Sequence, residues 1–228
     1  MTAQAINGYI IEGVSGVGKT RLLGALQAEL VRRRPACTKL VLSEHYTERV
    51  FEDARARGVV ELGEVLAHTK RVVEQIDALF DLEARSKFHG RRGNAGIYVL
   101  VERFLGSHAA HLWMSERRDL RNDEAAAIQC PYVTLAKYGV VPLVLHMAPG
   151  ALTESISETR RLRNEAWSAH LDRLGDDAQI RAHFQSWQEH LLRFYADYVD
   201  VPIVHRRIDR AACDFAEMAA ELVDEMNP

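Results

Sequence analysis

One stretch near the start of the chain constrains the fold more than any other, because it fits a phosphate-binding pattern at every fixed position. The stretch is Gly13-Val14-Ser15-Gly16-Val17-Gly18-Lys19-Thr20, which matches G-x-x-x-x-G-K-[ST]. It follows an apolar run at 9–11 and precedes a segment at 21–34 whose apolar residues recur at helical spacing. The alternative is an ordinary glycine-rich turn between a strand and a helix. The full match in this context favours a loop that binds phosphate, called here the P-loop.

The residue types of the P-loop suit a polyphosphate ligand. Glycines let successive backbone N–H groups turn inward, and the helix N-terminus that follows adds partial positive charge. We expect the ligand to be held by Gly13, Ser15, Gly16, Val17, Gly18, Lys19 and Thr20. Lys19 would reach the β- and γ-phosphates, and the Thr20 hydroxyl would bind Mg²⁺. The P-loop therefore predicts ATP and Mg²⁺ as cofactors, but it suits kinases, ATPases, GTPases and regulators alike.

Short apolar segments alternate with helical segments along the chain, as in a parallel sheet covered by helices on both faces. We expect strands at 9–11, 39–44, 97–101, 140–147 and 201–204. We expect helices at 21–34, 48–57, 59–87, 105–115, 122–138, 178–199 and 211–226, with another between the fourth strand and the arginines near 160. The prediction is an α/β protein with the P-loop NTPase fold: a five-stranded parallel sheet flanked by helices, with an arginine-rich lid. A length of 228 residues suits one kinase-like domain, 1–228, with the lid at about 157–177.

The composition of the chain limits the kinds of molecule that it is expected to bind. A net charge of −3 gives no global basic field, which disfavours polynucleotide binding. The three cysteines lack the paired spacing of a zinc site. The first residues lack the features of a signal peptide, and no apolar run approaches the ~20 residues of a membrane span. We therefore expect a cytoplasmic protein that binds no membrane, whereas assembly as a homodimer stays open.

Two glutamates follow predicted strands. Glu44 ends the second strand and Glu102 follows the third. Ligands of open α/β sheets collect at the carboxyl ends of the strands, so both side chains are expected beside the P-loop. One carboxylate would accept a proton from an acceptor hydroxyl, and the other would hold Mg²⁺ or its waters. The alternative for each is an ordinary surface carboxylate.

A cluster of arginines, Arg160, Arg161 and Arg163, follows the helix after the fourth strand. Guanidinium groups packed within one turn repel one another, and a polyanionic ligand would relieve that repulsion. Arginines on a closing lid can stabilise the transferring phosphoryl group. The alternative is a charged helix face paired with neighbouring glutamates. The P-loop elsewhere in the same chain favours the lid.

Several short motifs resemble those of the deoxynucleoside kinase and thymidylate kinase group. They are Ile11-Glu12-Gly13, Ser43-Glu44, Glu102-Arg103, the spaced Arg161-x-Arg163-x-Glu165, and residues 142–149. The resemblance implies a five-stranded parallel sheet, ATP with Mg²⁺, and an acceptor pocket formed by the helices between the second and third strands. It further implies that Glu44 is the base, that Arg103 steadies the acceptor, and that Arg161 and Arg163 are clamps on the lid.

The chain also departs from that group. His45 follows Glu44 where deoxynucleoside kinases have proline, and Phe104 follows Arg103 where they have serine. Thymidylate kinases have aspartate at the position of Glu102, and their Arg-Glu-Pro-Gly-Gly run is absent. These departures leave the acceptor open.

The leading hypothesis is an ATP-dependent kinase that transfers the γ-phosphoryl group to a hydroxyl of a small, nucleoside-like molecule. A second hypothesis is a nucleoside monophosphate kinase, whose acceptor would need further arginines such as Arg49 or Arg71. A third is a regulatory module that binds nucleotide, hydrolyses it slowly and acts through a partner.

Overall fold

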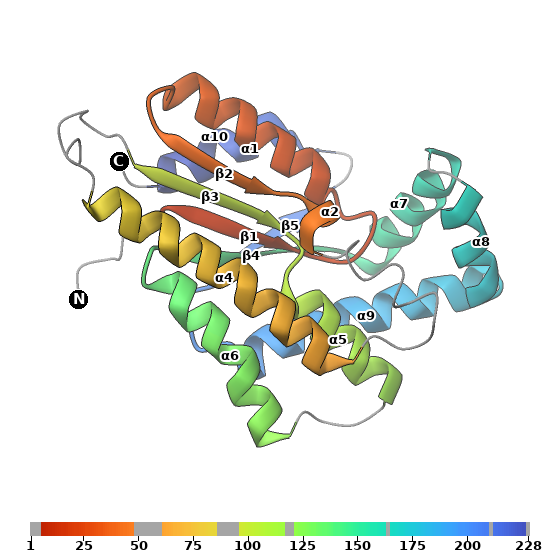
Figure 1. Cartoon of the computed structure of the whole chain (residues 1–228). Coiled ribbons are helices and arrows are strands. Elements are labelled where there is room, and N and C mark those ends of the chain that lie inside the picture. The colour runs from red at the N-terminus through yellow and green to blue at the C-terminus, as the bar shows by residue number, and fades with distance from the viewer. Residues whose placement is uncertain are drawn as a thin grey trace.

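The computed structural model describes residues 6–47, 61–85, 96–116, 121–162, 165–209 and 212–226. Its five strands form one sheet in the order β2-β3-β1-β4-β5, and every neighbouring pair is parallel (Figure 1). The strands are β1 (Gly8–Glu12), β2 (Thr38–Leu42), β3 (Ile97–Glu102), β4 (Val140–Met147) and β5 (Val204–Ile208). The predicted five-stranded parallel sheet is thus confirmed, and β1, which leads into the P-loop, lies at its centre.

Helices cover both faces of the sheet. They are α1 (Lys19–Arg33), α2 (Glu44–Thr47), α4 (Leu62–Arg85), α5 (Leu105–Glu116), α6 (Asn122–Ala136), α7 (Pro149–Leu162), α8 (Glu165–Leu174), α9 (Asp177–Tyr198) and α10 (Phe215–Glu225). Figure 1 shows α1 and α10 on one face, and α4, α5, α6 and α9 toward the other. Helices α7 and α8 lie beyond the end of the sheet to which the strand arrows point. A P-loop between a central parallel strand and α1 identifies the P-loop NTPase fold.

Two hydrophobic clusters flank the sheet because successive side chains of a strand point to opposite faces. Tyr9 and Ile11 of β1 belong to the cluster that includes α1 and α10, whereas Ile10 belongs to the one that includes α4, α5 and α6. All three side chains are fully buried. Burying an aliphatic side chain of this size stabilises a fold by about 1.5–3 kcal/mol. The central strands are therefore held from both faces, which fixes the position of the P-loop that follows β1.

The fifth strand was predicted too early. Strand β5 begins at Val204, where the predicted strand 201–204 ends. Pro202 lies in the predicted range and has no N–H with which to pair in a ladder. The observed strand pairs with β4 alone. Its sequence contains no apolar run, because it includes the half-buried Arg206 and the exposed Arg207. Arg206 forms an ion pair with Glu225 of α10.

Smaller corrections concern the second strand and the lid. Strand β2 ends at Leu42, so Glu44 does not end it but opens the short helix α2. A separate helix, α8, lies within the predicted lid, 157–177. The predicted helix 48–57 lies outside the described residues, and the extent of the domain and of its lid stays a prediction.

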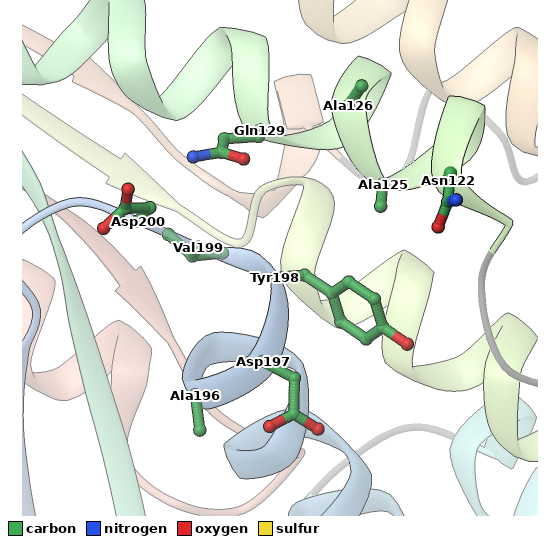
Figure 2. A pocket seen from close by; sticks show the side chains of 9 residues that line it. All are labelled: Asn122, Ala125, Ala126, Gln129, Ala196, Asp197, Tyr198, Val199 and Asp200. Carbon is green, nitrogen blue, oxygen red and sulfur yellow. The ribbon is translucent and has the colours of Figure 1, made fainter.

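A surface cavity of about 470 Å³ opens between the first half of α6 and the end of α9 (Figure 2). Its lining includes the amides of Asn122 and Gln129 and the carboxylates of Asp197 and Asp200. No residue of the P-loop lines it. In the part of the chain that the structure describes, no helix is both long and apolar enough to cross a membrane.

Candidate active site

The P-loop is fixed by its backbone and by Lys19. All three of its glycines, Gly13, Gly16 and Gly18, have positive φ angles, of 146°, 86° and 99°. A side chain would strain the backbone at these values, so the pattern needs glycine for a conformational reason. The Lys19 ammonium group is buried and donates to the carbonyl oxygens of Gly13 (2.8 Å) and Val14 (2.9 Å). Lys19, the residue expected to bind phosphate, thus lies inside the P-loop.

Two helices from distant parts of the sequence pack against the P-loop. The Ser155 hydroxyl of α7 donates to the carbonyl oxygen of Gly16 over 2.6 Å. The ring of Phe215, the first residue of α10, lies so close to Gly18 that a Cβ there would collide with it. The Arg21 guanidinium carbon stacks over the same ring, 4.8 Å from its centroid. The tip and the end of the P-loop are therefore both supported by tertiary contacts.

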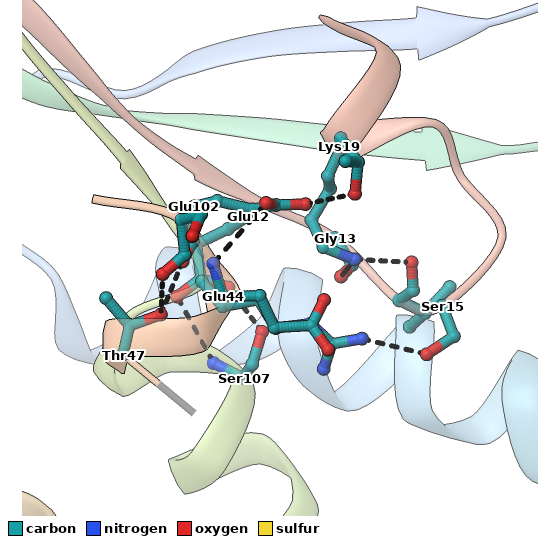
Figure 3. Close-up of polar contacts among 12 residues, drawn as sticks. Glu12, Gly13, Ser15, Lys19, Glu44, Thr47, Glu102 and Ser107 are labelled. Atoms are coloured by element: carbon teal, nitrogen blue, oxygen red, sulfur yellow. Dashed lines mark hydrogen bonds and ion pairs between the residues drawn. The ribbon is translucent and has the colours of Figure 1, made fainter. Parts of the chain in front are cut away.

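Thr20 and Glu102 meet beside the P-loop, as predicted for a metal site. The Thr20 hydroxyl donates to Oε1 of Glu102 over 2.5 Å, and Oε2 of Glu102 accepts the backbone N–H of Glu44 over 3.4 Å (Figure 3). The Glu102 carbonyl oxygen accepts from the Thr47 hydroxyl, which ties the end of β3 to α2. Mg²⁺ prefers hard oxygen ligands and usually takes the remainder from phosphates and water. One carboxylate beside one hydroxyl fits that preference.

The ligation of Mg²⁺ by Glu102 and Thr20 stays a prediction. Among the described residues, no group of three or more His, Cys, Asp or Glu side chains is arranged to hold a metal ion. A pair of protein ligands suffices for an ion that is bound together with substrate phosphates.

Arg103 joins the P-loop to Glu44. Its side chain is 3% exposed, and its Nη2 donates to the Ser15 hydroxyl over 2.8 Å. Its Nε lies 3.4 Å from Oε2 of Glu44, and its guanidinium carbon lies 5.6 Å from the ring centroid of Trp187. Glu44 is 23% exposed, so solvent reaches the carboxylate that the arginine holds. A single guanidinium group thus contacts the phosphate-binding loop and the predicted base.

The backbone at Arg103 is strained. Its φ angle of 55° makes it the one non-glycine residue with positive φ among the described residues. A left-handed conformation costs a residue with a Cβ about 1–2 kcal/mol. Such residues persist where the surrounding structure holds them, and they concentrate at functional sites. This conformation could not be predicted from sequence, because arginine has no preference for it.

Glu12 is a buried member of the site to which no role was assigned from sequence. It is the last residue of β1, is fully buried, and accepts the N–H of Phe104 over 3.0 Å and the N–H of Ser107 over 3.3 Å. The Ser107 hydroxyl donates to its other oxygen. Burial raises the pKa of Glu12, whereas these hydrogen bonds and the nearby charges of Lys19 and Arg103 lower it. The sequence signal was a carboxylate directly before the first glycine of the P-loop.

Aromatic and histidine side chains form a wall behind Arg103. The ring of Trp187, from α9, lies 5.7 Å from that of His111, from α5, and 6.3 Å from that of His183. Burial lowers the pKa of His183, and the neighbouring His111 and His170 lower it further. The wall is therefore mostly aromatic, with imidazole rings at its edges, and α9 contributes to it although no prediction placed α9 at the site.

The arginine cluster is only partly described. Arg160, near the end of α7, forms an ion pair with Asp172 of α8. Arg161 is in α7, but the position of its side chain lies outside the described residues, as does the whole of Arg163. The structure thus brings Lys19, Thr20, Glu44, Glu102 and Arg103 together, and it leaves the roles of Arg161 and Arg163 as predictions.

Helix α4 carries two charged residues at defined positions. Asp77 accepts a hydrogen bond from the hydroxyl of Tyr138, which lies two residues before β4, so its carboxylate is occupied in packing. Arg71 lies on the exposed face of the same helix. Arg49 lies outside the described residues.

The sequence matches no protein-family model and no curated protein sequence. Among solved structures, the chain is similar to a thymidylate kinase from Ehrlichia chaffeensis, with 12% sequence identity and a TM-score of 0.47. The alignment covers 97% of this chain and 98% of that chain. Thymidylate kinases are among the kinases that the sequence motifs resemble. At this similarity no residue role passes from that enzyme to this chain, and the fold assignment rests on strand order and the P-loop.

Proposed function

We propose that this protein is an ATP-dependent kinase that transfers the γ-phosphoryl group to a hydroxyl of a nucleoside-like small molecule. The observation that carries the proposal is the position of Arg103 between Ser15 of the P-loop and the carboxylate of Glu44. A nucleotide switch needs a P-loop but has no need of a partly exposed carboxylate held beside it. A kinase needs both, because its acceptor must lose a proton next to the bound phosphates.

In the proposed reaction the acceptor oxygen attacks the γ-phosphorus, and the bond from that phosphorus to the β–γ bridging oxygen breaks. Glu44 takes the acceptor proton, and ADP leaves with the bridging oxygen. Lys19 binds the phosphates. Thr20 and Glu102 would hold Mg²⁺, which would offset the negative charge of the phosphates. Arg103 orients Glu44 and the acceptor. Positioning and electrostatic stabilisation of this kind supply most of the catalysis in phosphoryl transfer.

A nucleoside fits the described contacts better than a nucleoside monophosphate. A phosphorylated acceptor would need cationic groups around its own phosphate. Of the arginines considered for that role, Arg71 lies on the exposed face of α4. Arg103 is already engaged with Ser15 and Glu44. We therefore expect turnover with nucleosides to exceed turnover with the matching monophosphates.

The test is a screen of nucleosides, nucleoside monophosphates and sugars for acceptor-dependent release of ADP from MgATP. We expect at least one nucleoside to raise ADP release well above the rate without acceptor. The Glu44→Gln variant should lose this acceptor-dependent rate and still bind MgATP. Slow hydrolysis that no acceptor stimulates, unchanged in Glu44→Gln, would instead favour a regulatory module.

A further inference from the structure

The turn between β3 and α5 is where the two halves of the proposed site are joined. Arg103 sits in this turn with its strained φ angle of 55°. Its own N–H donates to the carbonyl oxygen of Ile11 in β1 over 3.0 Å, which continues the pairing of the two strands by one step. That bond fixes the start of the turn. It does not fix the direction of the residues that follow Arg103, or the direction of the Arg103 side chain.

The carboxylate of Glu12 supplies the missing constraint. One of its oxygens accepts the N–H groups of Phe104, the residue after Arg103, and of Ser107 in the first turn of α5. The other oxygen accepts the Ser107 hydroxyl (Figure 3). The first N–H groups of a helix have no partner within the helix. Glu12 thus caps α5 from a neighbouring strand and holds the residues that follow the strained position.

The surroundings of Glu12 hold its carboxylate, and the hydrogen bonds that it accepts, in one position. The side chain is fully buried, and the equally buried Tyr195 of α9 lies close enough for the charge of Glu12 to raise the pKa of its hydroxyl, beyond the larger effect of burial. Tyr195 is in turn 3.0 Å from the hydroxyl of Tyr132 in α6. Each described partner is therefore itself fixed by packing. A buried network whose members are all satisfied holds its groups in one arrangement.

Glu12 also lies at the start of the P-loop, because Gly13 follows it directly. The same residue therefore adjoins the P-loop and bonds to the chain directly after Arg103. We propose that Glu12 is a positioning residue whose carboxylate fixes the Arg103 turn and so sets the guanidinium group between Ser15 and Glu44. Its effect on turnover rests on the proposed kinase function, but its effect on Arg103 does not.

Two conservative variants separate the effect of the length of the Glu12 side chain from the effect of its charge. Glu12→Gln keeps the length of the side chain and an oxygen for the N–H groups of Phe104 and Ser107, but it removes the charge. Glu12→Asp keeps the charge and shortens the side chain by one methylene, so it cannot reach both groups. Positioning predicts that Glu12→Asp is the more damaging change. A purely electrostatic role, through Lys19 and Arg103, predicts that Glu12→Gln is.

The first test reads the position of Arg103 without any turnover. Protein that contains 5-fluorotryptophan should give three ¹⁹F resonances, since the chain has three tryptophans, and Trp187→Phe identifies that of Trp187. Because Arg103 stacks on Trp187, we expect Glu12→Asp to shift this resonance and Glu12→Gln to shift it less. The resonance of Trp113, which stacks with Arg193 instead, serves as the control. A lower melting temperature with an unmoved Trp187 resonance would reduce Glu12 to a merely structural residue and overturn the proposal.

The second test is a double-mutant cycle on acceptor turnover. We expect Glu12→Asp to lower kcat/KM for the acceptor by about 10- to 100-fold in the wild-type background and by less than about twofold in an Arg103→Lys background. Equal losses in both backgrounds would contradict action through Arg103. If Glu12→Asp does not fold, Ser107→Ala removes one contact to Glu12 and is put through both tests. Absence of any acceptor-dependent turnover in the wild type would refute the proposed function, while the ¹⁹F result would still decide the role of Glu12.

Discussion

The charged groups around the P-loop and the charged group of Arg160, near the end of α7, are held in different ways. Lys19 is buried and bound to backbone carbonyl oxygens, and Arg103 is 3% exposed. Arg160, by contrast, is 40% exposed and pairs with Asp172, which is 60% exposed. Buried, hydrogen-bonded charges keep one geometry, whereas exposed ion pairs contribute only about 0–1 kcal/mol and are screened by salt. The P-loop half of the predicted site is therefore preorganised, whereas the exposed pair of Arg160 and Asp172 holds its two side chains only weakly.

The largest effect that this contrast predicts is that of Lys19→Ala. The change removes a buried cation inside the P-loop, where the phosphates are proposed to bind. We expect acceptor-dependent turnover to fall by about 10³- to 10⁵-fold, the range known for cations at the transferred phosphoryl group. Initial rates of ADP release measure this. Lys70→Ala, at an exposed lysine of α4, is the matched control and should leave the rate unchanged. Turnover close to wild type in Lys19→Ala would show that the P-loop is not the donor site.

Glu44→Gln should have the next largest effect and should separate chemistry from nucleotide binding. Removal of a general base lowers turnover by about 10²- to 10⁴-fold. Because Glu44 pairs with Arg103, on the acceptor side of the proposed site, we expect the Kd for MgATP to change by less than about twofold. Calorimetry gives the Kd, and rates of ADP release give kcat. Glu74→Gln, at an exposed carboxylate of α4, is the control, and full activity in Glu44→Gln would exclude Glu44 as the base.

Ser15→Ala tests whether the P-loop and the acceptor side are joined through Arg103. The change removes the hydroxyl that accepts from Nη2 of Arg103. A hydrogen bond to a charged group contributes about 1.5–3 kcal/mol, which corresponds to roughly 10- to 100-fold in kcat/KM for the acceptor. Ser157→Ala, which removes an exposed hydroxyl of α7, should change nothing. An effect of Ser15→Ala confined to the KM for ATP would place Ser15 on the donor side alone.

The preorganised half was also the half that could be predicted from sequence. The P-loop is contiguous, so its glycines and its lysine are visible as one pattern, and the central strands are continuous apolar runs because both of their faces are buried. Strands β1, β3 and β4 therefore lie where they were expected. Glu102 could be placed beside Thr20 by the rule that parallel strands bring their carboxyl ends to one edge.

What sequence could not show depends on contacts between distant segments. The left-handed turn at Arg103 is held by Glu12, which lies 91 positions earlier in the chain. Trp187 reaches the site from α9 through packing that no local pattern records. Strand β5, at the edge of the sheet, carries partly exposed charged residues and was misplaced because it lacks an apolar run. Each of these features follows from tertiary burial and not from the spacing of residue types.

Arg160→Ala should have the smallest effect and gives the sharpest contrast with Lys19→Ala. It breaks only the exposed ion pair between α7 and α8, so we expect turnover to change by less than about fivefold and the melting temperature by little. Arg85→Ala, which breaks a similar exposed pair in α4, is the matched control for stability. If Arg160→Ala lowers turnover a hundredfold while Arg85→Ala leaves it unchanged, the arginine cluster is as firmly built into the site as the P-loop. The ion pair with Asp172 would then hold α8 in a position that catalysis requires, because loss of a surface charge alone cannot account for an effect of that size.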